Sequence, residues 1–103
     1  MDTYNLIRQA ILDKKSITCV YEGYIRHLTP HAIGTSKTRP FAMCYQYGGQ
    51  SKTGLSSEPS KNWRCIEIDK ISSLEINKDN PKTSSNHSMR NRCLDVIDLE
   101  VRY

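Results

Sequence analysis

The chain has 103 residues, a formal net charge of +4 at pH 7 and 25% charged residues. This length allows one domain with one modest core, since such a chain buries roughly two-thirds of the surface that its unfolded form exposes. The charge excess favours anionic partners slightly but is far below that of a DNA-coating protein. No apolar run approaches the roughly 20 residues that span a bilayer, and the polar, acidic start is unlike a signal peptide. We therefore expect a cytoplasmic protein without a membrane partner.

The first half of the chain predicts a helix followed by a β-hairpin. An apolar stripe at helical spacing predicts a helix over residues 3–14, capped by Asp2 or Thr3. Alternating apolar residues predict strands over residues 16–22 and 24–28, joined by a turn. Pro30 is expected to end the second strand, because proline cannot donate to a ladder. Residues 31–34 are interpreted as irregular and 35–38 as a turn.

The second half predicts further strands separated by two polar segments. Residues 39–47 are apolar on both faces and are interpreted as a central strand. Residues 48–61 are rich in Gly, Ser and Lys, which indicates a mobile or functional loop. A fourth strand lies within residues 62–71 and ends at a turn around Asp69 and Lys70, and a short fifth is expected over 74–76. Residues 77–92 are interpreted as a linker or long loop, and residues 94–103 alternate as a last strand.

The four cysteines are spread evenly, with no close pair and no histidine at the spacing of a metal site. They are Cys19, Cys44, Cys65 and Cys93. The first three sit within apolar strand patterns. We interpret the cysteines as small core residues in a reducing compartment rather than as disulfide or zinc ligands, and we expect no metal and no cofactor.

Arg64 is the most informative single residue. It shares a strand face with Ile66 and Ile68, so its guanidinium needs an anion, an aromatic ring or a carboxylate as a partner. The functional interpretation is a clamp for phosphate or carboxylate, whose geometry the planar guanidinium matches. The structural alternative is an ion pair with one of three carboxylates: Glu22, Glu67 or Asp69.

Several segments together resemble a WYL domain, the ligand-binding domain usually joined to a helix-turn-helix in bacterial transcription regulators. They are Ile7-Arg8-x-Ala10-Ile11, then Ile17-x-x-x-Tyr21-x-Gly23-x-x-Arg26-x-Leu28-x-Pro30-His31, an apolar strand ending in Tyr45, and Trp63-Arg64-x-Ile66-x-Ile68-Asp69-Lys70-Ile71. The resemblance covers residues 6–76. Two features depart from it: the Trp-Tyr-Leu triplet aligns with Pro40-Phe41-Ala42, and the DNA-binding helices are missing. The regulator role is therefore not carried over whole.

The resemblance implies a small SH3-like or Sm-like barrel. Together with the predicted elements, we expect a mainly β fold with one N-terminal helix and a C-terminal strand, and residues 77–103 lie outside the family core. The resemblance also implies a basic and aromatic pocket for a nucleotide or nucleic acid, with five matched positions: Tyr21, Arg26, His31, Tyr45 and Arg64. The expected organisation is a barrel with its helix over residues 1–76, a linker over 77–92, and a strand over 93–103 that completes the fold or the oligomer.

Nine residues are predicted to bind the ligand because they carry a positive charge, an imidazole or an aromatic ring near predicted strands or in the long loop. They are Arg64, Arg26, His31, Tyr21, Tyr45, Tyr47, Trp63, Arg39 and Lys52. The structural alternatives are core packing for the aromatic residues and solvent exposure for Arg26 and Arg39. Lys52 lies in a segment that resembles a phosphate-binding loop in composition but not in order, and an ordinary hairpin loop is its alternative.

No carboxylate pair, Cys-His pair or Ser-His-Asp order stands out, so we expect no catalysis. The leading interpretation is a domain that binds a nucleotide or a short nucleic acid, as a sensor, a sequestering protein or an accessory subunit. The alternative is a structural or protein-interaction module that pairs with a partner chain through its barrel edge or C-terminal strand. The apolar alternation over residues 97–103 favours a homodimer or higher homo-oligomer.

Overall fold

The computed structural model describes residues 2–50, 62–78 and 94–101. The elements in chain order are α1 (Thr3–Leu12), β1 (Ile17–Tyr21), β2 (Tyr24–Ser36), β3 (Arg39–Gly49), β4 (Trp63–Glu67), the 3-10 helix η2 (Ile68–Lys70), β5 (Ile71–Ile76) and β6 (Val96–Glu100). The prediction of a mainly β protein with one N-terminal helix is confirmed.

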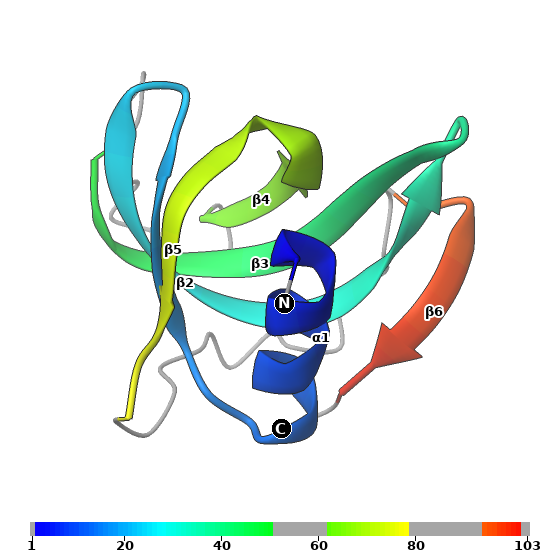
Figure 1. The fold of residues 1–103 in the computed structure, drawn as a ribbon, viewed down its shortest axis with the longest axis horizontal. Coiled ribbons are helices and arrows are strands. Elements are labelled where there is room, and N and C mark those ends of the chain that lie inside the picture. Colours follow the sequence, from blue (N-terminus) through cyan, green and yellow to red (C-terminus); the bar gives the residue numbers. More distant parts are fainter. Residues whose placement is uncertain (1, 51–61, 79–93, 102–103) are drawn as a thin grey trace.

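All the strand pairs are antiparallel and belong to one six-stranded sheet. The order is β4-β3-β2-β1-β5, and β6 pairs with the far half of β2. Figure 1 shows α1 in front of β2 and β3, between β5 and β6. Among the described strands the sheet is open, because β4 and β5 at its two ends do not pair with each other. The predicted barrel is therefore not confirmed.

Helix α1 packs its apolar face on the sheet and is capped at both ends. Ile7, Ala10 and Ile11 are buried, and the Asn5 backbone N–H donates to the Asp2 side chain, as expected for an N-cap. The helix ends at Leu12, two residues earlier than predicted. Lys14 adopts a left-handed conformation with a φ of 53°, which turns the chain out of the helix and toward β1.

Strand β2 is longer than predicted, and Pro30 lies inside it rather than at its end. The pairing of β1 with β2 reaches only Leu28, and the pairing of β6 with β2 begins at Ala32. Pro30 therefore sits in the gap between these two ladders, where no neighbouring strand needs its missing N–H. A register shift between Pro30 and Ala32 marks a bulge on the β3 side. The expectation of an irregular segment after Pro30 is wrong for this reason.

The hairpin between β2 and β3 also holds β6 in place. Lys37 and Thr38 form its tip, both with positive φ, and the Asp95 carboxylate accepts a hydrogen bond from the Lys37 backbone N–H at 2.9 Å. Beside the hairpin, a Cβ at Gly34 would overlap the Val96 carbonyl oxygen. Glycine at this position therefore allows β6 to approach β2 closely enough to pair.

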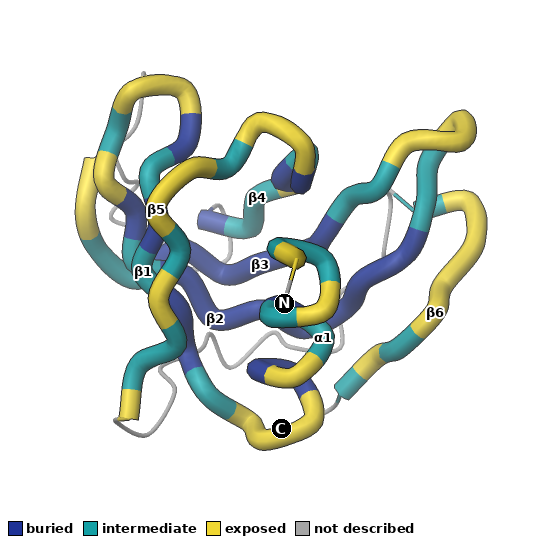
Figure 2. Tube along the Cα trace, in the orientation of Figure 1, coloured by how far each residue is buried: buried dark blue, intermediate teal, exposed yellow. Residues whose placement is uncertain are grey.

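The core lies between the inner face of the sheet and α1. Its largest fully buried apolar residues are Ile7, Ile11, Ile17, Leu28, Ile33 and Ile66. Figure 2 shows β2 and β3 as the most continuously buried strands, whereas β6 and the hairpin tips are exposed. Ala42 and Cys44 on one face of β3, and Met43 and Tyr45 on the other, are all buried. The prediction that β3 is a central strand is confirmed.

The C-terminal strand pairs within its own chain. β6 pairs with residues Ala32 to Thr35 of β2, and Leu99 and Val101 pack against the core. Asp98 of β6 accepts hydrogen bonds from the Tyr4 hydroxyl at 2.7 Å and from Arg8 Nε at 3.3 Å. These contacts join the two ends of the described chain. They also give β6 an intramolecular role, and the predicted homo-oligomer stays a prediction.

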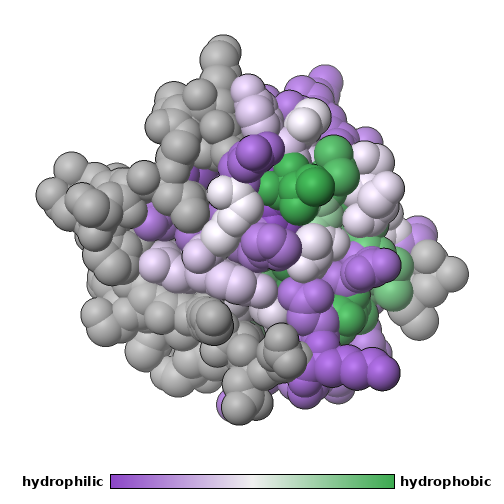
Figure 3. Space-filling model, turned by 90° about the vertical axis from the view of Figure 1, so that its left-hand side faces the viewer, coloured by the Kyte–Doolittle hydropathy of each residue, from purple (hydrophilic) through white to green (hydrophobic). Residues whose placement is uncertain are grey.

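Exposed large apolar side chains are few in the described part of the chain. They are Leu12, Ile25, Val96 and Ile97. On the face of the molecule in Figure 3, hydrophobic residues form small patches amid hydrophilic ones. Within the described residues, no helix has both the length and the apolar composition needed to cross a membrane.

Candidate functional site

Arg26 is a buried arginine held by neutral groups on several sides. It pairs with Cys19 of β1 in the sheet register, which places it on the inner face, and the residue is 4% exposed. Its Nε donates to the Tyr21 carbonyl at 3.3 Å, and its Nη1 donates to Gln46 Oε1 at 3.4 Å. The guanidinium also lies 5.0 Å from the centre of the Tyr21 ring. The Arg26 side chain is therefore fixed in position.

The ion pair between Arg26 and Glu22 joins a buried guanidinium to an exposed carboxylate. Its Nη2 is 3.5 Å from Glu22 Oε1, and the Glu22 side chain is 59% exposed. A carboxylate in contact with water is strongly solvated and offsets only part of the cost of burying the guanidinium.

Arg64 lies on the same inner face, on strand β4 at one end of the sheet. It pairs with Cys44 of β3, is half-buried, and donates from Nη1 to the Trp63 carbonyl at 3.4 Å. Burial lowers the pKa of Arg64, and the nearby positive charge of Arg26 lowers it further. Arg26 and Arg64, with Tyr21 and Gln46 beside Arg26, are called the arginine cluster below.

Three other predicted residues form an aromatic group on the opposite face. His31 and Trp63 meet edge to face with their ring centres 4.6 Å apart, and Tyr45 and Trp63 do so at 5.4 Å. His31 is 2% exposed and Tyr45 8%. The structure thus brings these residues together as a packed cluster, separate from the arginines, rather than as an open stacking surface.

Tyr47 belongs to a polar network at the β1 end of the sheet. Its hydroxyl donates to Ser16 Oγ at 3.1 Å, and its ring stacks on His27 with the ring centres 6.0 Å apart. Asn77 Nδ2 donates to Ser16 Oγ and to Thr18 Oγ1, each at 3.1 Å. The network ties the end of β5 to β1, which is a structural use of Tyr47.

Of the remaining two predicted residues, Arg39 belongs to neither cluster, and Lys52 is not among the described residues. Arg39 has a 67% exposed side chain and pairs with Glu67 at 3.4 Å, near the other end of β3. Glu67 also pairs with Lys70 at 3.7 Å. Lys52 and most of the long loop around it lie outside the described residues.

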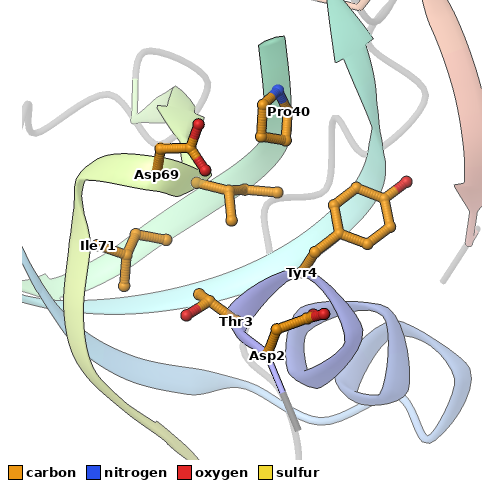
Figure 4. A pocket seen from close by; sticks show the side chains of 7 residues that line it. Asp2, Thr3, Tyr4, Pro40, Asp69 and Ile71 are labelled. Atoms are coloured by element: carbon orange, nitrogen blue, oxygen red, sulfur yellow. The ribbon is translucent and has the colours of Figure 1, made fainter.

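A pocket of about 410 Å³ lies between the first turn of α1, η2 and the start of β5. Figure 4 shows Asp2, Thr3 and Tyr4 on the helix side and Asp69, Ile71 and Pro40 around the rest of the space. Ile68 completes its lining. We call it the η2 pocket. None of the nine predicted ligand-binding residues is among the described residues that line it.

Sequence reasoning missed the residues that surround Arg26 and those that line the η2 pocket. Gln46 lies on an apolar strand, where a buried amide was a usable signal, because a buried polar group needs a partner. Asp69 was interpreted as a turn residue and as one of three candidate ion-pair partners of Arg64, but not as part of a pocket. Its place beside the start of α1 depends on the tertiary fold, and no spacing in the sequence indicates it.

The cysteines divide into buried thiols and one disulfide-bonded residue. Cys19 and Cys44 are free and buried, and burial raises the pKa of Cys19 to about 11 and that of Cys44 further. Both are therefore protonated, unreactive core residues at neutral pH, as interpreted. Cys65 is instead exposed and disulfide-bonded, so its interpretation as a core thiol is wrong. Cys93 lies outside the described residues.

The disulfide at Cys65 has a consequence for the predicted compartment. Disulfides persist in oxidising compartments and are rare in the cytosol. The bond therefore weighs against the cytoplasmic location, which stays a prediction. Within residues 2–50, 62–78 and 94–101, no group of three or more His, Cys, Asp or Glu is arranged to hold a metal ion.

No family model, curated protein or solved structure matches this chain. The resemblance to a WYL domain therefore stays a prediction from the sequence.

Proposed function

We propose that this protein is a non-enzymatic binding domain for an anionic ligand, a nucleotide or a short nucleic acid, and that the arginine cluster holds its phosphate. The observation that carries the proposal is the sheet register, which pairs Arg26 with Cys19 and Arg64 with Cys44 and so puts both arginines on the inner face; there the charge of Arg26 adds to burial in lowering the pKa of Arg64. Like charges in a desolvated site repel each other, and a bound phosphate relieves the repulsion.

The two arginines have different parts in this proposal. Arg64 is half-buried and presents its guanidinium to the ligand, where the planar fork suits two oxygens of one phosphate. Arg26 is behind it, fixed by the Tyr21 carbonyl and Gln46, and adds positive potential. Because its position is set before binding, little side-chain entropy is lost when the anion arrives.

A single nucleotide fits this arrangement better than a long strand. A strand is held by many exposed cations along a groove, whereas Arg26 is almost fully buried and Arg64 partly so. We also propose that the sheet forms the small barrel expected from the resemblance to a WYL domain. The antiparallel order β4-β3-β2-β1-β5 around one core is compatible with it.

The test is calorimetric titration of the protein with ATP and with a short single-stranded DNA. Arg64→Ala should weaken binding by about tenfold to a few hundredfold, since hydrogen bonds between charged groups are lost. Arg64→Lys should restore part of the affinity, because the charge remains and the fork is gone. Arg39→Ala is the matched control: it removes the same charge from an exposed position and should change the affinity less than twofold, within about 0.4 kcal/mol.

If the Arg64→Ala and Arg39→Ala variants bind the probes with equal affinity, the arginine cluster is not the binding site. If the wild type binds neither ATP nor the DNA, the proposed function itself is wrong. The salt dependence separates the two ligands. We expect a shallow slope of log Kd against log salt, and a slope corresponding to about four or more phosphate contacts would assign a nucleic acid instead.

A further inference from the structure

We infer that the η2 pocket is a second binding site, for a small organic cation with a short apolar body and a primary ammonium head. This site is separate from the arginine cluster and opposite to it in charge. Its volume of about 410 Å³ lies in the range of pockets for small molecules.

The walls of the pocket supply the apolar part of the recognition. Ile68 is 3% exposed and belongs to the core, and Ile71 is packed against that core, so both hold fixed positions. Pro40 is rigid at the start of β3, and Tyr4 is fixed because its hydroxyl bonds to Asp98. A hydrocarbon chain placed against these groups loses contact with water.

The negative charge of the pocket comes from two carboxylates with different roles. Asp2 Oδ1 accepts from the Asn5 backbone N–H at 2.8 Å, and its Oδ2 accepts from Asn5 Nδ2 at 3.3 Å, so it caps α1. A carboxylate has lone pairs for further donors. Asp69 is exposed, and no described residue forms a hydrogen bond or ion pair with its carboxylate. Figure 4 shows the two residues at different sides of the pocket.

The two described cations that pair at this end of the molecule, Lys70 and Arg39, do not pair with Asp69. Lys70 and Arg39 both pair with Glu67, at 3.7 Å and 3.4 Å. Asp2 and Asp69 therefore bring two carboxylates to the lining of the pocket, and both ion pairs use Glu67 instead, although the whole chain carries +4. A phosphate is repelled from such a pocket and an ammonium ion is attracted. An apolar body with an ammonium head matches both properties of the lining.

The experiment uses three probes that share a six-carbon chain: hexylamine, hexanol and hexanoate. Each is titrated into the full-length protein and followed by the backbone amide shifts of Thr3, Tyr4, Asp69 and Ile71. Hexylamine should bind most tightly and hexanoate least. Asp69→Asn should weaken hexylamine binding by about fivefold, and added salt should weaken it as well.

The matched control is Asp13→Asn, which removes the same charge at the opposite end of α1. It should leave hexylamine binding unchanged. The inference is overturned if hexanol binds as tightly as hexylamine, if both variants have the same effect, if the shifted amides lie elsewhere, or if no probe binds. These outcomes do not depend on ATP binding, so the failure of one site is distinguishable from the failure of the other.

Discussion

The arginine cluster and the η2 pocket carry opposite charges within one small domain. In the cluster, the exposed carboxylate of Glu22 pairs with the buried Arg26, whose charge lowers the pKa of Arg64. Beside the pocket, the Glu67 carboxylate pairs with both Arg39 and Lys70, and Asp69 is exposed to solvent. The two regions differ in their local ion pairing although they share one net charge of +4, which is why we propose ligands of opposite charge for them.

The two regions also differ in what they contribute to stability. The arginine cluster is buried, so a change there affects both the fold and the proposed ligand. The charged rim of the η2 pocket is exposed, so Asp69 contributes to the proposed binding and little to stability. The following substitutions test this difference, beginning with the largest expected effect.

Arg26→Ala should lower the free energy of unfolding by about 2–4 kcal/mol, because it removes a large buried side chain and leaves its acceptors unpaired. Arg26→Met should recover the part of this loss that comes from the emptied space, since its side chain fills that space, although the acceptors stay unpaired. Both variants should weaken ATP binding. Urea unfolding gives the stabilities, and equal losses for Ala and Met would show that the charge itself stabilises the fold.

Tyr4→Phe should have a smaller effect on stability and none on the η2 pocket. The ring that lines the pocket remains, whereas the hydrogen bond from the hydroxyl to Asp98 of β6 is lost. We expect a modestly lower Tm by circular dichroism and unchanged hexylamine affinity. A loss of hexylamine binding would mean that the position of Tyr4, and with it the pocket, depends on β6.

The smallest expected effect is the pH dependence of the Tm difference between the wild type and Tyr4→Phe. The hydrogen bond from Tyr4 lowers the pKa of Asp98, so its stabilisation is present above about pH 4 and is lost as the pH falls further. Burial and the bond to Asp98 raise the pKa of Tyr4 to about 12, so that stabilisation is present below about pH 10 and is lost as the pH rises toward 12. The Tm difference should therefore be largest between these limits, and a constant difference would contradict this linkage.

Elements whose signals are local could be predicted from the sequence alone. The apolar stripe of α1, the alternation in β1 and β3 and the turn after β4 depend on residues a few positions apart, and all of these elements form close to the expected places. The pattern also indicated that Arg64 shares a face with core residues, because alternation along a strand fixes the face on which each residue lies. Arg26 and Arg64 of the arginine cluster were both among the nine residues predicted to bind the ligand.

Which of these residues come into contact depends on the tertiary structure. Pro30 is accommodated within β2 because two different strands flank it, a fact that depends on where β1 ends and β6 begins. The arginines are separated from His31 and Trp63 because they lie on opposite faces of one sheet, although Trp63 and Arg64 are neighbours in the chain. The η2 pocket joins residues 2–4 to residues 68–71, and such a contact depends on how the helix packs on the sheet. Packing is set by the shape and burial of many distant side chains at once, and no short stretch of sequence carries that information.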